Sequence, residues 1–304
     1  MITCFDIGGT TIKAAVAHSA TDIVSLGRVA TPAHDFDAFA DAIAALIAQG
    51  GAPTGSAIAI SIAGVVDPAT NVATVANIPC INGRALGPDL SSKLSRPVIV
   101  GNDADCFALA EAHAGAGKGF NVVFGVILGT GVGGGIVADG RLIRGAGGFS
   151  GEWGHATIVQ TETQAWPHKI AHMACGCGQL GCTDTIGGAR GLERLHAQIH
   201  GQTLSSLDIV SAWGQGDATS TQTMTLYTEL LAAPLALLVN VLGPDIIPVG
   251  GGLGNSPELV AALDAAVRPR ILRKLDRPLI VPAQLTVDAG LIGAASLAYS
   301  EGVV

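Results

Sequence analysis

The same local pattern occurs twice in this chain: an apolar run, a glycine-rich turn and a second apolar run. The runs and turns lie at residues 2–7, 8–11 and 12–17, and again at 122–128, 129–135 and 136–138. Apolar, β-rich runs on both sides of a short turn are typical of a β-hairpin. Glycines in such a turn let backbone amides approach a bulky anion. The repeat therefore predicts two phosphate-binding hairpins, one in each half of an α/β protein.

The composition is that of a folded protein with more than one domain. The chain has 304 residues, of which 49% are apolar and 13% charged, and this combination excludes a largely disordered protein. At roughly 100–200 residues per domain, the length indicates two lobes. Residues 115–119 (GAGKG) lie between the two hairpins and are a candidate linker.

Charge and hydropathy exclude two classes of partner. With 16 basic and 24 acidic residues the formal charge is −8, so nothing in the composition favours binding to nucleic acid. The longest charge-free stretches, 42–66 and 119–138, are broken by glycines and polar residues and do not predict a membrane span. The N-terminus lacks the features of a signal peptide. We expect a soluble, cytoplasmic protein that binds neither nucleic acid nor membrane.

Periodicity and turn residues predict the remaining elements. We expect helices at residues 36–48, 104–114 and 290–300, strands at 57–62, 98–100 and 245–249, a hairpin turn at Asp139-Gly140, and a mainly helical region at 185–242 that is interrupted at Pro234.

The first turn has the residue types of a phosphate site with a magnesium ion. Its glycines would present N–H groups, its threonines hydroxyl groups, and Asp6 would hold magnesium through water. The residues of this set are Asp6, Gly8, Gly9, Thr10, Thr11 and Lys13. The alternative is that two glycines serve only the geometry of a hairpin turn.

The second turn lacks the P-loop lysine and does not open a helix, so it is neither a P-loop nor a Rossmann fingerprint. It can still offer several N–H groups to phosphates, and paired with the first turn it would form a phosphate clamp. Its candidate residues are Gly129, Thr130, Gly131, Val132, Gly133 and Gly134. Gly251 and Gly252 would let a flat ring lie close to the backbone. The alternatives are a flexible loop and a plain turn.

Asn102 and Asp103 stand where a predicted strand delivers polar residues to the start of a helix. Asp103 has the chemistry of a general base that accepts the proton of an attacking alcohol, and Asn102 could bind a neighbouring hydroxyl. The alternative is that these residues only cap the helix.

A cluster of cysteines follows the motif GEWGH. His155, Cys175, Cys177 and Cys182 form a complete tetrahedral set for zinc, and four protein ligands leave no position for a catalytic water. The predicted zinc is therefore structural. His168 and His172 are rival ligands. The same knot would bring the carboxylates of Glu152 and Asp184 together with the imidazole of His155, a set suited to the vicinal hydroxyls of a sugar.

Taken together, the motifs DIGGT, GNDAD, GTGVGGG, GEWGH and CGCGQLGC-x-D, in this order, resemble those of the ROK family of sugar kinases. The resemblance implies the two-lobed, actin-like (ribonuclease H-like) ATPase fold with a mixed sheet in each lobe, ATP and Mg²⁺ as cofactors, and a homodimer. It implies an N-terminal lobe at 1–115, joined by the C-terminal helix 288–304, and a C-terminal lobe at 116–287 with the zinc loop.

The resemblance also assigns roles. It implies that Asp103 is the catalytic base for the sugar 6-hydroxyl and that the sugar ligands are Gly64, Asn77, Asn102, Asp103, Glu152, His155 and Asp184. The family usually has glutamate at the position of Asp184. The long separation of His155 from Cys175, with NIPCINGRAL, NDADCFALAEA and GGARG, most resembles the bacterial N-acetyl-D-glucosamine kinase branch.

We therefore expect ATP-dependent phosphorylation of N-acetyl-D-glucosamine at its 6-hydroxyl. N-acetylmannosamine and glucose are the alternative substrates. From other classes, the rivals are a sugar-sensing transcriptional regulator and a sugar-binding protein that has lost catalysis. The regulators carry an added N-terminal helix-turn-helix, whereas the first predicted strand here begins at residue 2.

Overall fold

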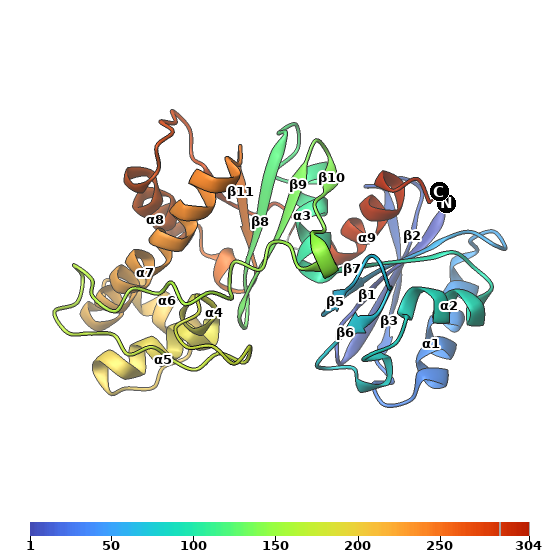
Figure 1. Ribbon diagram of the computed structural model, residues 1–304, viewed down its shortest axis with the longest axis horizontal. Helices are drawn as coiled ribbons and strands as arrows, with labels where there is room; N and C mark the ends of the chain where they lie inside the picture. The colour runs from blue at the N-terminus through green and yellow to red at the C-terminus, as the bar shows by residue number, and fades with distance from the viewer. Residues whose placement is uncertain (286, 304) are drawn as a thin grey trace. The chain divides into compact units, whose positions relative to one another are not determined.

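The computed structural model describes residues 1–285 and 287–303, and its chain divides into two compact units. The first unit comprises Met1–Asn121, Gly135–Ser150 and Leu285–Val304, and the second comprises Val122–Gly134 and Gly151–Gln284. Figure 1 colours the chain from blue to red, and the red C-terminal helix lies beside the blue strands of the first unit. The units differ from the predicted lobes mainly in Gly135–Ser150, which groups with the first unit.

A mixed five-stranded sheet forms the centre of the first unit. Its strand order is β3 (Ile23–Ala30), β2 (Thr11–Ala17), β1 (Ile2–Ile7), β4 (Ile58–Ile62) and β7 (Val98–Asn102). Strands β1, β2 and β3 pair antiparallel through hairpins, whereas β4 and β7 continue the sheet parallel to β1. The carboxyl ends of β1, β4 and β7 therefore share one edge, where their following residues meet.

Helices cover both faces of this sheet. On one face, α1 (Phe36–Gly50) and α2 (Leu86–Leu94) join the apolar cluster that includes Phe5 and Ile60. On the other face, α9 (Ala289–Ser300) packs in the cluster that includes Cys4. Alternate residues of β1 point to opposite faces of the sheet, so Cys4 and Phe5 belong to different clusters. Two smaller strands, β5 (Val65–Val66) and β6 (Ala73–Thr74), form a separate ribbon.

The packing of α3 (Asp103–Ala114) on α9 depends on a glycine. A Cβ atom at Gly293 would lie 2.0 Å from the carbonyl oxygen of Cys106, closer than any real contact. Both helices are largely buried on this side. The helix backbones therefore approach one another directly, which fixes α3 and the residues at its N-terminus.

A second five-stranded sheet has the order β10 (Arg141–Leu142), β9 (Val132–Ala138), β8 (Val122–Leu128), β11 (Ile247–Gly250) and β12 (Ile280–Pro282). It is also mixed, since β9 and β10 pair antiparallel while β8, β11 and β12 run parallel. The helices of the second unit are α4 (Asp184–Gly187), α5 (Ala189–His200), α6 (Ser206–Gly214), α7 (Ala218–Leu242) and α8 (Pro257–Val267).

The predicted α/β class with mixed sheets is confirmed, as are the three expected helices and the opening hairpin. The extent of the second turn was predicted wrongly, because β9 begins at Val132 and only residues 129–131 form the turn. Gly134 and Gly135 lie inside this strand, where a Cβ atom would meet Trp153 and Ala108 respectively. The turn at Asp139-Gly140 is confirmed by positive φ angles at both residues.

The predicted interruption at Pro234 was wrong, since α7 runs unbroken from Ala218 to Leu242. Proline inside a helix removes one hydrogen bond, at a cost of about 3 kcal/mol. Pro234 is buried, and neighbouring Leu230, Leu231 and Leu235 are almost fully buried. Burial of this apolar face offsets the local cost.

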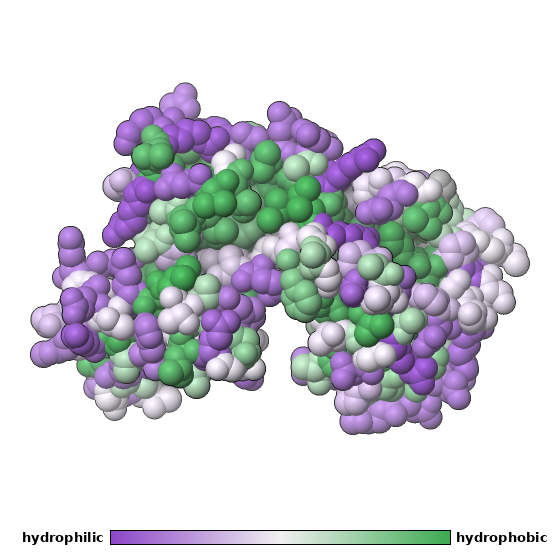
Figure 2. All heavy atoms as spheres, in the orientation of Figure 1, coloured by the Kyte–Doolittle hydropathy of each residue, from purple (hydrophilic) through white to green (hydrophobic). Residues whose placement is uncertain are grey.

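By length and composition, α7 is the one helix among the described residues that could cross a membrane, and 56% of its most apolar stretch is buried inside the protein. Core helices of folded domains pass the same test, so this finding is weak evidence for a membrane span. Leu237 and Val241 are exposed on α7. Figure 2 shows apolar side chains gathered on the second unit around α7 and β8.

We expect Gly293→Ala to lower the free energy of unfolding by about 1–3 kcal/mol, because the added methyl group forces α3 and α9 apart. Urea unfolding followed by far-UV circular dichroism measures this change. Gly214→Ala is the control, since a Cβ atom there meets nothing within 4 Å. Equal stability of both variants would show that the contact between α3 and α9 tolerates a side chain.

Candidate active site

The first glycine turn and Asp103 line one cavity of the first unit. The cavity has a volume of about 230 Å³ and is lined by Asp6, Ile7, Gly8, Thr10, Thr11, Lys13, Ala63 and Asp103. Asp6 on β1 lies opposite Lys13 on β2, with 3.5 Å between Oδ2 and Nζ. The turn is closed by the Gly8 N–H, which donates to the carbonyl of Thr11 at 3.0 Å. Carboxylates, hydroxyls and an ammonium group therefore face the same space.

The geometry of the turn does not by itself require its two glycines. Neither Gly8 nor Gly9 has a positive φ angle. A Cβ atom at Gly9 would lie 2.9 Å from Cβ of Asn77, so close packing explains this glycine. At Gly8 the nearest atom would be the Thr11 carbonyl oxygen at 3.8 Å, which leaves room for a side chain. Packing therefore does not explain the glycine at position 8.

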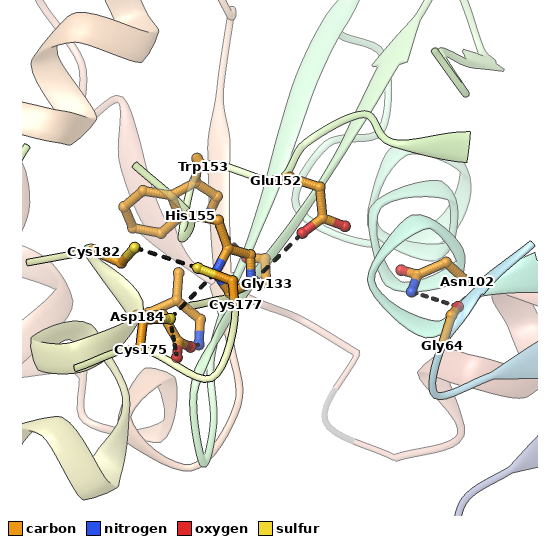
Figure 3. A network of polar contacts seen from close by, with 11 residues as sticks. Gly64, Asn102, Gly133, Glu152, Trp153, His155, Cys175, Cys177, Cys182 and Asp184 are labelled. Atoms are coloured by element: carbon orange, nitrogen blue, oxygen red, sulfur yellow. Dashed lines mark hydrogen bonds and ion pairs between the residues drawn. The ribbon is translucent and has the colours of Figure 1, made fainter. Parts of the chain in front are cut away.

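Asn102 is the cap of α3, as the alternative interpretation of this motif expects. Its Oδ1 accepts from the Ala104 N–H at 2.8 Å and from the Asp105 N–H at 3.3 Å. Its Nδ2 donates to the carbonyl of Gly64 at 2.9 Å, as Figure 3 shows. Asp103, the first residue of α3, is exposed and lines the cavity. The cap thus fixes the place of the neighbouring carboxylate.

Three glycine-containing segments meet at the second turn. A Cβ atom at Gly251 would lie 2.5 Å from the carbonyl of Leu128, and one at Gly188 would lie 2.5 Å from Cα of Gly131. The N–H of Ala189, the first residue of α5, donates to the carbonyl of Gly129 at 2.8 Å. The structure therefore brings Gly251 to the turn and adds Gly188, which sequence reasoning missed as a site residue although the motif GGARG marks its position.

Two side chains hold the strand that leaves this turn. The indole N–H of Trp153 donates to the carbonyl of Gly133 at 2.9 Å, and the N–H of Val132 donates to Oδ1 of Asp184 at 2.8 Å. Trp153 is 7% exposed and also contacts Phe124 edge to face. The sequence placed Trp153 between two predicted ligands but gave no signal of this contact.

His155, Cys175, Cys177 and Cys182 form one cluster, in which the potential ligand atoms all lie within 4.8 Å of one another. Cys177 Sγ lies 3.7 Å from Cys182 Sγ, and Cys175 Sγ lies 3.6 Å from His155 Nδ1 (Figure 3). A tetrahedral zinc ion with ordinary bond lengths separates its ligand atoms by about 3.5–3.8 Å. The donor set and its spacing fit zinc.

Two glycines allow the chain to turn tightly around the cluster. Gly178 and Gly181 have φ angles of 90° and 71°, in the left-handed region that favours glycine. His172, a rival ligand, is outside the cluster, and its Nε2 lies 2.8 Å from the carbonyl of Val159. His168 contacts the ring of Trp166 instead.

The thiols of the cluster differ in acidity. Burial raises the pKa of Cys182 to about 12 and also raises the pKa of Cys175, whereas the backbone N–H of Gln179 lowers the pKa of Cys177 to about 7. Buried thiolates are unfavourable without a neighbouring positive charge. A divalent cation supplies that charge, so the chemistry of the donor set also fits a metal ion.

Glu152 lies beside the cluster, close to His155. Nδ1 of His155 faces the sulfur atom of Cys175, and Nε2 lies 3.9 Å from Oε2 of Glu152 (Figure 3). The predicted group of Glu152, His155 and Asp184 is therefore local to the second unit, whereas Asp103, Asn102, Gly64 and Asn77 belong to the first.

The comparisons with known proteins agree with one another. The model of the ROK family matches residues 2–301. An N-acetylgalactosamine kinase of Shewanella sp. (strain ANA-3) is 36% identical over 296 residues, which are 97% of this chain and 95% of the relative. An N-acetyl-D-glucosamine kinase of Photobacterium profundum is 35% identical over 295 residues, which are 96% and 97% of the two chains.

A solved structure gives the same result for the fold. The crystal structure of a ROK family glucokinase from Streptomyces griseus, in complex with glucose and AMPPNP, is similar with a TM-score of 0.75 and 30% sequence identity. The similarity covers 98% of this chain and 99% of the other.

We expect the purified protein to carry one zinc ion per chain and Cys177→Ser to lose it, because the variant removes one of four ligands. Metal content by inductively coupled plasma mass spectrometry, together with soluble yield, measures the effect. Cys80→Ser is the control, since its thiol donates to the carbonyl of Pro32 outside the cluster. A folded, zinc-free wild-type protein would contradict the assignment.

Proposed function

The chain belongs to the ROK family of sugar kinases, and we propose that it transfers the γ-phosphate of ATP to the 6-hydroxyl of N-acetyl-D-glucosamine. The observation that carries the proposal is the cavity in which Asp103 and the first glycine turn face the same space. A phosphoryl transfer needs a group that takes the hydroxyl proton and donors that hold the phosphates. This cavity offers both.

In the proposed mechanism, Asp103 orients the 6-hydroxyl and accepts its proton as the phosphoryl group is transferred. Catalysis of this reaction depends mostly on positioning and charge stabilisation. Lys13, Thr10 and Thr11 and the backbone of the turn would hold phosphate oxygens in the first unit. The same role in the second unit is proposed for residues 129–134, which comprise the turn and the start of β9, with Gly251 and Gly252 beside the adenine ring.

Two metal ions belong to the proposal. Magnesium, when bound with ATP, neutralises the phosphate charge, and Asp6 is the residue proposed to hold it through water. Zinc, when bound, would fix the knot of His155, Cys175, Cys177 and Cys182 and has no open position for chemistry. The closeness of one imidazole and three thiols, a donor set typical of zinc, supports this part.

The sugar ligands stay predictions. Glu152 and His155 are proposed to bind hydroxyls, as are Asn102, Asn77 and Gly64. In the structure Asn102 has already used Oδ1 on the helix and one N–H on Gly64, which leaves its second N–H for a sugar. The homodimer, the cytoplasmic location and the division into lobes at 115 and 287 are likewise proposals.

N-acetylgalactosamine is a second candidate substrate, because of the name of one relative. One relative of similar identity is named an N-acetylgalactosamine kinase, which differs from N-acetyl-D-glucosamine kinases in the sugar it takes. The chemistry at the 6-hydroxyl is the same for both sugars, so Asp103 would serve either.

We expect Asp103→Asn to fold normally and to lower kcat by about 10²–10⁴-fold, because an amide cannot accept the proton. A coupled assay that follows ADP release measures kcat, and circular dichroism checks the fold. Asp41→Asn, an exposed position on α1, is the control and should retain full activity. Turnover of Asp103→Asn within a few fold of the wild type would remove the proposed base.

The substrate is tested with a panel of N-acetylglucosamine, N-acetylgalactosamine, N-acetylmannosamine and glucose. We expect the highest kcat/KM with N-acetylglucosamine, by about tenfold or more, because a site that hydrogen-bonds a substituent rejects sugars that lack it, as glucose does, or that carry it in another configuration, as the two epimers do. A higher kcat/KM with another sugar would change the assigned substrate. Sugar binding without turnover of any of the four would indicate a binding protein instead of a kinase.

A further inference from the structure

Asp184 has two contacts that its predicted role as a sugar ligand does not explain. Its Oδ1 accepts from the Val132 N–H at 2.8 Å, and its Oδ2 lies 3.9 Å from Sγ of Cys175 (Figure 3). Its own backbone N–H donates to the carbonyl of Gly154 at 2.9 Å. Oδ1 therefore already accepts a backbone hydrogen bond, and Asp184 contacts three separate segments of the second unit.

The turn is built around this carboxylate. A Cβ atom at Gly131 would lie 2.4 Å from Oδ1 of Asp184, so glycine is needed there to admit the carboxylate. The bonded N–H belongs to Val132, the first residue of β9, directly after the turn. A hydrogen bond to an ionised acceptor is stronger than one to a neutral acceptor. Asp184 thus fixes the conformation in which the turn enters β9.

Trp153 holds the residue that follows Val132 in β9. Its indole N–H binds the carbonyl of Gly133, the next residue along β9. Because Asp184 and Trp153 bind consecutive residues, one holding an N–H and the other a carbonyl, the backbone that joins the turn to β9 is held at two adjacent points. Trp153 stands next to Gly154, which accepts from the backbone of Asp184.

We propose that Asp184 is a positioning residue, which ties the cysteine knot to the phosphate-binding turn and holds the amides of Thr130 and Gly131 in place for the nucleotide. This deepens the proposed function and rests on it for the identity of the nucleotide. The carboxylate acts through the backbone of the turn and does not contact the sugar.

Measured affinities for the nucleotide and for the sugar distinguish a positioning role of Asp184 from a role as a sugar ligand. Affinities for ADP and, separately, for N-acetylglucosamine are measured by calorimetry, and metal content is measured on the same samples. We expect Asp184→Ala to weaken ADP binding by about tenfold or more, with sugar affinity within about twofold of the wild type and the metal retained. Asp184→Asn keeps an acceptor oxygen for Val132 and should retain ADP affinity within about threefold.

A second variant tests the contact between Asp184 and the turn by changing the turn. Gly131→Ala displaces the carboxylate without changing it and should reproduce the selective loss of ADP affinity. Asp276→Ala, an exposed carboxylate of the second unit, is the control and should bind both ligands as the wild type does.

Each pattern of results has one meaning. Loss of sugar affinity in Asp184→Asn with ADP affinity unchanged would overturn the proposal and restore Asp184 as a sugar ligand. Unchanged ADP affinity in both Asp184→Ala and Gly131→Ala would also overturn the proposal. So would an Asp184→Ala variant that loses the metal together with its affinity for both ADP and the sugar. If the wild type binds no ADP, the proposed function fails instead.

Discussion

Backbone segments of the second unit approach one another so closely at the turn of residues 129–131 that no Cβ atom fits between them. Gly251 lies against Leu128, Gly188 lies against Gly131, and each approach would bring an added Cβ within 2.5 Å of backbone. Backbone atoms cannot move aside as the end of a side chain can. The glycines at these places are therefore required by the fold, and their amides and carbonyls are brought together as a consequence.

Close approach of backbone segments also requires a glycine in the first unit, where α9 packs on α3. Gly293 lets α9 contact the backbone of α3, and the position of α3 fixes the cap at Asn102 and the carboxylate of Asp103. The high glycine content thus has a physical reason in both units. A large share of the chain's 42 glycines serve close packing or left-handed turns, and Gly8 is an exception that has space around it.

Each unit also pairs a glycine turn with a carboxylate that stands at the start of a helix. Asp103 begins α3 and lines the cavity of the first turn, whereas Asp184 begins α4 and accepts a hydrogen bond from the strand after the second turn. The two carboxylates have the same chemistry but different surroundings. Asp103 lines a cavity of about 230 Å³, whereas Asp184 already accepts a hydrogen bond from the backbone after the turn.

Several local features of this protein could be predicted from the sequence. The opening hairpin, the cap at Asn102 that was the alternative interpretation of its motif, and the cluster of His155 with three cysteines were all recognisable from residue types in the sequence, and the structure contains them. Tertiary structure decided what spacing cannot show: that Pro234 continues a helix, that β9 begins at Val132, that Trp153 and Gly188 support the turn, and where the carboxylate of Asp184 points. These outcomes depend on contacts between segments far apart in the chain, where packing and hydrogen bonding outweigh local preference.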